Sequence, residues 1–592
     1  MKRSEQKIND TWNMEDMFPS DKVWEEDFEK ATKEVAKYKE FSGKIKDSKD
    51  KLIEFLKFND KISLLAERLY VYANQKYHED MGNGKYQAYS GKAQKLVVDI
   101  GSASAFFEPE VLEIDEATIN QWLEDEKLNN YKRYIEEILR SKKHTLDKKT
   151  EEILAKSKKM ANAADNIYAM YNGADIDFPT VKDSEGKEIK ITHGNFVPIL
   201  SGEDRELRKN AFTGLYNTYG AMKNTIAATY NANVEQANFY ADVRKYPSSR
   251  AMYLDGSNIP ESVYDNLIKV VHENMDLMYR YVRLRKKSLG VEELHMYDIY
   301  APIAKAPSKK YSFEEAKTIV KEGLAPMGEE YLSKLQEGFD NRWIDVYENE
   351  GKRSGAYSWG AYGTHPYVLL NFQGTLDHVF TSAHEMGHAL HSYYSDANQT
   401  YINAGYKIFV AEVASTCNES LLIHDLLKKT KDKETRAYLI NHFLEQFKGT
   451  LYRQTMFAEF EKITHEMVQK GETLTADVLC ETYYDLNKLY FGEDIVLDKE
   501  IALEWARIPH FYNPFYVYQY ATGISAAITL SRKIMKEGEA GVKDYMKFLT
   551  GGGSKAPIDL LKLAGVDMTK EEPVREALQL FRELLDEMEA LI

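Results

Sequence analysis

The sequence predicts a mainly α protein, and two observations carry that prediction. Its 592 residues include only 33 glycines and 14 prolines, less than the combined share of about 12% in average composition, so residues that interrupt helices are scarce. Apolar residues also recur at helical spacing, as at Ile62, Leu65 and Leu69 and again between 131 and 139. We interpret these stripes as helix faces that pack in a core.

Composition and charge narrow the functional classes. The chain has 78 Lys and Arg against 94 Asp and Glu, a formal net charge of −16, which argues against nucleic acid or an anionic membrane as a partner. Cys417 and Cys480 are its only cysteines, so we expect no disulfide framework and a reducing compartment. The first residues lack an apolar signal segment, and no apolar run approaches the roughly 20 residues of a membrane span. We therefore expect a cytoplasmic protein without a membrane partner.

The residue pattern changes near residue 176, which predicts a boundary. Residues 176–192 alternate apolar and polar side chains around a turn that contains Gly186, the pattern of a β-hairpin. We expect residues 1–200 to form an N-terminal helical region that ends with this hairpin, and residues 201–592 to form a second domain. Within that domain, the glycine-rich stretch 351–375 contains Tyr367–Phe372, which predicts a short strand in a small β-sheet.

Histidines concentrate in one part of the second domain. Five of the 14 histidines lie in residues 365–391, and two of them, His384 and His388, flank Glu385 in an HExxH pattern. On a helix, imidazoles at i and i+4 project from one face and can hold one Zn²⁺. Glu385 is rotated from His384 by about 100°, so it can act as general base on a metal-bound water without binding the metal itself. The pattern predicts the centre of a zinc peptidase, with residues 201–592 as its catalytic domain.

The flanking residues favour a helix around this motif. Thr375 can serve as its N-cap, with Asp377 in the first turn. Val379, Ala383 and Met386 then form an apolar stripe, which we expect to anchor the helix in a core.

A site of this type needs one further protein ligand and leaves the fourth position to water. The longer metzincin motif would require a glycine and then a histidine after His388, but His391 and Tyr394 stand at those positions. Glu412 follows His388 by 24 residues in an apolar helical stretch, a distance that suits a helix returning antiparallel to the first. We predict Glu412 as the third ligand.

Several neighbours are expected to support the ligands. We predict Glu419, on the helix face of Glu412, and Asp377 as carboxylates that hydrogen-bond a ligand imidazole or the adjacent backbone. We expect His391 to be a hydrogen-bonded neighbour, with a fourth-ligand role as the alternative. Cys417 lies off the ligand face, and we expect it to be buried packing.

A second group of polar aromatic residues lies between His510 and Tyr520, where four tyrosines and one histidine occur within eleven residues. A tyrosine hydroxyl or imidazole N–H close to a metal can stabilise the oxyanion of a tetrahedral intermediate. We predict that role for this segment, with an aromatic packing segment as the alternative.

The chain resembles the thimet oligopeptidase family of zinc metallopeptidases, in particular its oligoendopeptidase F branch. The resemblance extends over essentially the whole chain and is most specific in TSAHEMGHALHSYY, FVAEVASTCNE and HFYNPFYVYQYATG. It implies a two-lobed helical ellipsoid with a deep central channel, one zinc ion per chain, and short peptides as substrates. It implies the following site residues: His384, His388 and Glu412 as zinc ligands, Glu385 as general base, and His510 with Tyr512, Tyr516 or Tyr518 as the oxyanion- and substrate-binding group.

We therefore expect a zinc-dependent oligoendopeptidase that hydrolyses internal bonds of short unstructured peptides through Glu385-assisted attack of zinc-bound water. We expect Tyr367, Val368 and Leu369 to pair with the substrate backbone as a β-strand. Two alternatives stay open: a metal-holding scaffold that binds peptides without turnover, and a metallocarboxypeptidase or dipeptidase that trims peptide ends. Co²⁺ or Mn²⁺ could use the same ligands.

Overall fold

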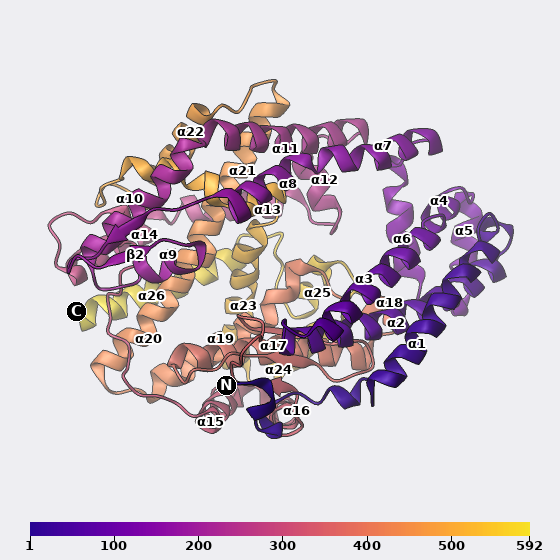
Figure 1. Cartoon of the computed structure of the whole chain (residues 1–592), viewed down its shortest axis with the longest axis horizontal. Coiled ribbons are helices and arrows are strands. Elements are labelled where there is room, and N and C mark those ends of the chain that lie inside the picture. Colours follow the sequence, from indigo (N-terminus) through magenta and orange to yellow (C-terminus); the bar gives the residue numbers. More distant parts are fainter. The chain divides into compact units, whose positions relative to one another are not determined.

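The computed structural model describes the backbone of residues 1–592 and every side chain except that of Lys148. The protein is mainly α, as the sequence predicts, with two small sheets among its helices (Figure 1). Across residues 1–592, no helix has both the length and the apolar composition that a membrane span requires.

The chain divides into two compact units, each built from three separate segments. The first unit comprises residues 1–145, 309–425 and 530–566, and the second comprises residues 146–308, 426–529 and 567–592. The boundary expected near residue 200 therefore falls inside the second unit.

The helices of the first unit are α1 (Asp21–Val35), α2 (Lys49–Glu79), α3 (Gly84–Ser104), α4 (Phe107–Leu112), α5 (Glu116–Trp122), α6 (Lys132–Arg140), α15 (Phe313–Gly323), α16 (Gly328–Asp340), α17 (Leu376–Asn398), α18 (Tyr401–Ala404), α24 (Glu539–Leu549) and α25 (Pro557–Leu563). Two further helices, α19 (Ile408–Lys429) and α23 (Tyr518–Glu537), belong to both units in sequence. The apolar stripes predicted around residues 62–69 and 131–139 lie on α2 and α6, and Ile62, Leu69 and Ile135 are buried.

The helices of the second unit are α7 (Lys148–Ala161), α8 (Ala163–Met170), α9 (His193–Leu200), α10 (Arg205–Ala221), α11 (Lys223–Val243), α12 (Ser249–Asp255), α13 (Glu261–His272), α14 (Met275–Leu289), α20 (Lys433–Gln446), α21 (Arg453–Gln469), α22 (Ala476–Phe491) and α26 (Glu572–Leu591). The predicted hairpin is confirmed in this unit: β1 (Thr180–Lys182) pairs antiparallel with β2 (Glu188–Lys190).

The first unit contains a three-stranded sheet in the order β3-β5-β4. In it, β5 (Tyr367–Leu369) runs parallel to β3 (Ile344–Asp345) and antiparallel to β4 (Tyr357–Trp359). The strand predicted within Tyr367–Phe372 is thus confirmed for its first three residues, which are fully buried. Helix α17 packs against β4 and β5, so the sheet supports the helix that carries the HExxH motif.

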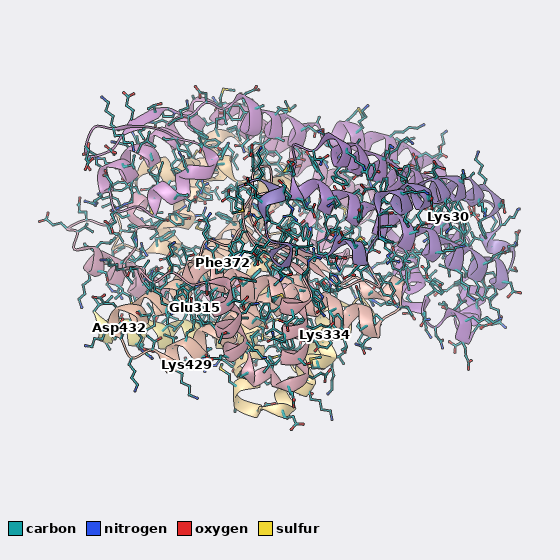
Figure 2. The ribbon with its side chains drawn as sticks, turned by 60° about the horizontal axis from the view of Figure 1, so that its bottom comes forward. Lys30, Glu315, Lys334, Phe372, Lys429 and Asp432 are labelled. Carbon is teal, nitrogen blue, oxygen red and sulfur yellow. The ribbon has the colours of Figure 1, made fainter. Side chains whose placement is uncertain are left out.

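Phe372, which follows the sheet, fixes the first turn of α17. Its ring lies 5.4 Å from the ring of Phe313 on α15 and 5.9 Å from that of His378 on α17. Phe372 is buried, whereas charged side chains such as Lys30 and Asp432 are exposed (Figure 2). These ring contacts pack the first turn of α17 against α15.

The N-terminal segment covers one edge of this sheet. The backbone N–H of Val346 donates to the carbonyl of Asp10, and the N–H of Asn13 donates to the carbonyl of Arg342, both at 2.9 Å. These bonds use the outer edge of β3, so β4 is the remaining edge of the sheet.

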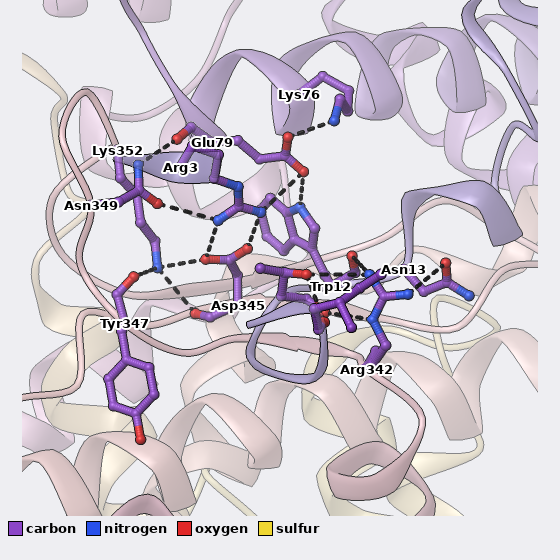
Figure 3. Close-up of polar contacts among 12 residues, drawn as sticks. Arg3, Trp12, Asn13, Lys76, Glu79, Arg342, Asp345, Tyr347, Asn349 and Lys352 are labelled. Carbon is purple, nitrogen blue, oxygen red and sulfur yellow. Dashed lines mark hydrogen bonds and ion pairs between the residues drawn. The ribbon is translucent and has the colours of Figure 1, made fainter. Parts of the chain in front are cut away.

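A buried cluster of charges ties the same N-terminal segment to the sheet (Figure 3). The Asp345 carboxylate on β3 pairs with the Arg3 guanidinium and with the Lys352 ammonium, the latter at 2.7 Å. Arg3 also lies 3.3 Å from Glu79, which accepts a hydrogen bond from the Trp12 indole. Because the side chains of Asp345 and Lys352 are at most 1% exposed, each charge depends on its partner.

We expect Asp345→Ala to lower the free energy of unfolding by about 3–5 kcal/mol, because it leaves the buried Lys352 ammonium without its carboxylate. Urea denaturation followed by tryptophan fluorescence measures the change. The matched control is Lys46→Ala, which breaks a pair with Glu113 whose side chains are about half exposed; it should cost less than about 1 kcal/mol. Equal losses in the two variants would contradict the assignment of Asp345 to a buried cluster.

Candidate metal centre

The helix that carries the HExxH motif begins and packs as predicted. The Thr375 hydroxyl accepts a hydrogen bond from the backbone N–H of His378 at 3.2 Å, which caps α17. Val379, Ala383 and Met386 are fully buried. The apolar face therefore fixes the helix, and the motif is held on a rigid element.

A close backbone contact brings α19 against α17 beside the motif. A Cβ atom at Gly387 would lie 2.6 Å from the Cα of Ser415, a distance that real Cβ atoms do not adopt, so only glycine fits there. The Asn418 side-chain amide donates to the carbonyl of Ala383 at 3.1 Å. These contacts hold the two helices at the short separation that their acidic and imidazole side chains need.

Three ligand atoms converge at this contact. The Nε2 atoms of His384 and His388 are 3.2 Å apart, and the Glu412 Oε2 lies 3.4 Å from each of them. Tetrahedral bonds of 2.0–2.1 Å to one Zn²⁺ would place ligand atoms roughly 3.3–3.4 Å apart. The side chains of His384, His388 and Glu412 thus fit one metal ion, and the structure brings together the three predicted ligands.

Carboxylates support the ligands, as predicted for Glu419. His384 Nδ1 hydrogen-bonds the Glu419 carboxylate, which leaves Nε2 to face the other ligand atoms. The Ser415 hydroxyl donates to Glu412 Oε2 at 3.2 Å, so the residue one turn after the ligand also orients it.

Charge in the centre favours a cation. Burial acts to lower the pKa of His384, but Glu419 and Glu412 outweigh it and hold that pKa well above its usual value. Burial acts to raise the pKa of Glu412, yet hydrogen bonds from His384 and His388 hold it well below its usual range. The direction of the His384 shift indicates that the neighbouring carboxylates favour positive charge at this point, which a metal ion also requires.

Glu385, between the two histidines in sequence, is a buried carboxyl with a free oxygen. Its side chain is buried at 7% exposure, and its Oε2 has no hydrogen-bond partner among the described residues. Burial raises the pKa of Glu385, with the neighbouring His384 and His388 acting against that shift. A buried carboxyl with a free oxygen and a raised pKa is suited to take up and return a proton.

Asp377, His391 and Cys417 are not part of the group of converging ligand atoms. Asp377 lies in the first turn of α17, two turns and about 10 Å before His384, so the prediction that it supports the ligands is wrong. His391 is buried and stacks on the Tyr406 ring at 3.8 Å, and burial lowers its pKa to about 3. Cys417 is fully buried, as predicted, and burial raises the pKa of its thiol to about 12.

Two of the predicted tyrosines of the 510–520 segment, which belongs to the second unit, are packing residues. The hydroxyls of Tyr512 and Thr229 lie 2.7 Å apart, and the Tyr512 ring stacks on Tyr168 at 4.2 Å. Tyr518 is 3% exposed, with its ring 5.0 Å from that of Tyr264. The catalytic role predicted for these two residues stays a prediction.

The same segment gathers three other rings. His510 lies 6.3 Å from Tyr516 and 6.2 Å from Tyr520, and the two tyrosine rings are 5.6 Å apart. His510 is exposed and both tyrosines are partly exposed, so this group can meet a ligand. Tyr520 was not among the residues predicted from sequence; as a fourth tyrosine in the same polar aromatic segment, it could have been included.

Two cavities lie against α17 and the β4 segment. One of about 410 Å³ is lined by His378 and Thr381 before the HExxH motif and by Ala356 before β4. The other, of about 630 Å³, is lined by Ser392 after the motif and by Trp359 of β4. The metal ligands thus lie between two cavities along the same helix.

The strand predicted to receive a substrate cannot do so. Tyr367–Leu369 is the central strand, and both of its edges are already paired, so that prediction is wrong. The N–H of Val368 donates to the carbonyl of Trp343 on the β3 side, so its polar groups turn away from β4. Ser358 is opposite Val368 in the antiparallel pair, and its N–H and C=O therefore point away from β5. The edge that can accept a further strand belongs to β4.

Known families and proteins match this chain over its length. The model of peptidase family M3 matches residues 199–580, and that of oligopeptidase F matches residues 110–178. The chain is 50% identical to oligopeptidase PepF of Bacillus subtilis over all of this chain and 88% of the relative. It is 40% identical to group B oligopeptidase PepB of Streptococcus agalactiae over 98% of this chain and 97% of the relative.

Solved structures agree with this relationship. The crystal structure of oligoendopeptidase-F from Enterococcus faecium matches with a TM-score of 0.77 at 36% identity, covering 96% of this chain and 99% of that one. With its HExxH helix, its converging carboxylate and these matches, the chain belongs to peptidase family M3.

Proposed function

We propose that the protein is a zinc-dependent oligoendopeptidase that hydrolyses internal bonds of short unfolded peptides. The convergence of His384 Nε2, His388 Nε2 and Glu412 Oε2 within 3.2–3.4 Å of one another carries the proposal. Two imidazoles and one carboxylate are the ligand set of zinc peptidases that keep a position open for catalysis. Similarity to proteins named oligopeptidases supports the choice of peptides as substrates.

The protein groups divide the chemistry between them. Zinc, when bound, acidifies a water molecule and polarises the scissile carbonyl. Glu385 takes up the proton that the attacking water releases and gives it to the leaving amine, and its raised pKa suits both transfers. The Glu419 carboxylate keeps His384 in the orientation that binds metal.

We assign oxyanion stabilisation to the group of His510, Tyr516 and Tyr520. Each side chain carries an N–H or O–H donor, and the three rings lie within 6.3 Å of one another. Donors that are fixed before the reaction stabilise the developing negative oxygen without reorganisation in the transition state.

We place the substrate backbone along β4. Ser358 offers one N–H and one C=O on the free edge of the sheet, and cavities flank the metal ligands on both sides. Pairing through main-chain groups is nearly independent of side-chain identity, which suits a peptidase of broad specificity.

Glu385→Gln should retain one zinc ion per chain but cleave peptides at least about 10³-fold more slowly, because the amide cannot accept the proton. The substrate is a quenched fluorescent peptide with both ends blocked, so that an enzyme that trims free ends gives no signal. Near-normal turnover by this variant would contradict the assignment of Glu385 as the general base. Failure of the wild-type protein to cleave the blocked peptide would exclude an endopeptidase.

Glu412→Ala should lower the bound zinc by about tenfold or more, since it removes one of three protein ligands. Metal analysis after dialysis measures the content. Asp377→Asn is the matched control, because Asp377 lies about two helical turns from the ligands, and it should retain zinc. Unchanged zinc content in the Glu412 variant would show that a different residue is the third ligand.

Methylation of single backbone amides of one substrate peptide should lower kcat/KM at one position and spare its two neighbours, because Ser358 offers one outward C=O to accept a substrate N–H. A peptide that lies along β4 turns every second residue toward the strand, and a methyl group there removes a donor and blocks approach. The measurement is kcat/KM for a set of peptides, each methylated at one backbone amide. Equal losses at consecutive positions would rule out pairing with β4.

A further inference from the structure

A wholly buried carboxyl in the second unit has no part in the chemistry described above. Glu461 on α21 is 0% exposed. Its Oε1 accepts a hydrogen bond from the backbone N–H of Phe515 at 2.8 Å, and its Oε2 has no partner among the described residues. Burial raises the pKa of Glu461 well above its usual value, opposed by the Phe515 amide. Burying a carboxyl with one unpaired oxygen lowers the stability of the fold, so Glu461 is a candidate for a functional role.

Phe515, its partner, has a strained backbone. Its φ is +56°, in the left-handed region that is a genuine outlier for a bulky residue. Such a conformation persists only where the surroundings hold it. The Phe515 ring lies 4.6 Å from His465 and 5.8 Å from Tyr264, and the Glu461 hydrogen bond holds the amide itself.

The strained residue stands directly before Tyr516. The backbone angles at Phe515 set the direction in which the chain continues, and hence where the Tyr516 hydroxyl lies relative to His510 and Tyr520. The start of the segment is fixed separately, because the Asn233 amide donates to the carbonyl of Phe511 at 3.4 Å. Glu461 therefore supplies a side-chain acceptor to the stretch between that fixed start and α23.

We propose that Glu461 is a positioning residue, which holds the backbone of Phe515 in its left-handed conformation and thereby places Tyr516 in the group with His510 and Tyr520. This inference rests on the proposed function of that group. What Glu461 supplies is a buried acceptor of fixed position, and a negative charge is not required.

Two substitutions separate the acceptor from the rest of the side chain. Glu461→Gln keeps an oxygen that can accept the Phe515 N–H, so its kcat should stay within about threefold of wild type. Glu461→Leu removes the acceptor, and its kcat should fall roughly ten- to hundredfold, as small misplacements of reacting groups do, with KM nearly unchanged. Glu461→Met, read in the same way, replaces the Leu variant if that protein does not fold.

The readout beyond activity is hydrogen exchange at the Phe515 amide, followed by mass spectrometry on peptides from residues 511–518. Exchange should accelerate in Glu461→Leu and stay slow in Glu461→Gln. Thr455→Val, on the same helix and also fully buried, is the matched control and should change neither kcat nor this exchange, because its hydroxyl donates to the carbonyl of Leu451. Zinc content should equal that of wild type in every variant, because the metal ligands are not touched.

A double-mutant cycle with Tyr516→Phe tests the route of the effect. If Glu461 acts through the Tyr516 hydroxyl, Glu461→Leu should add no further loss of kcat in the Tyr516→Phe background. Additive losses, or a Gln variant as impaired as the Leu variant, would overturn the proposal. Faster exchange at the Phe515 amide of Glu461→Leu, together with a wild-type kcat, would also overturn the proposal but would leave the peptidase function intact. A wild-type protein that cleaves no peptide would instead show that the proposed function itself is wrong.

Discussion

The metal centre depends on one contact, the approach of the α17 and α19 backbones at Gly387. The space beside Ser415 admits a hydrogen atom and no side chain. Because the helices meet this closely, the Glu412 carboxylate on α19 reaches the imidazoles of His384 and His388 on α17. The Glu419 carboxylate, also on α19, reaches Nδ1 of His384. The glycine within the motif is therefore as much a part of the centre as the ligands around it.

A second constraint decides which edge of the three-stranded sheet can bind a further strand, because each strand can pair along two edges only. β5 has used both of its edges, and the N-terminal segment at Asp10 and Asn13 occupies the outer edge of β3. The pairing capacity that remains lies on β4, next to the helix that carries the ligands. The buried charges of Arg3, Asp345 and Lys352 hold this arrangement in place.

Local features of the site were predictable from sequence, and features that depend on distant partners were not. Helix capping and apolar period predicted the helix that carries His384 and His388. A distance of 24 residues and an apolar surrounding favoured Glu412, whose carboxylate converges with the two imidazoles. Spacing alone could not distinguish Tyr512 from Tyr516, because the partner of Tyr512 is Thr229, more than 250 residues earlier. Sheet order is equally nonlocal, so the choice of substrate strand failed. The deep channel implied by the family resemblance stays a prediction, because it depends on how the two units are arranged.

The division of each unit into three separate segments has a consequence for synthesis on the ribosome. The first unit includes residues 530–566, and the second ends with residues 567–592. Neither can complete its contacts while the chain is growing, since domains fold as units and long-range contacts form late. The serine pair Ser420 and Ser531, which joins the ligand helix to the last segment of its unit, forms only when nearly the whole chain has emerged. A peptidase built in this way completes the unit that holds its candidate metal ligands only at the end of translation.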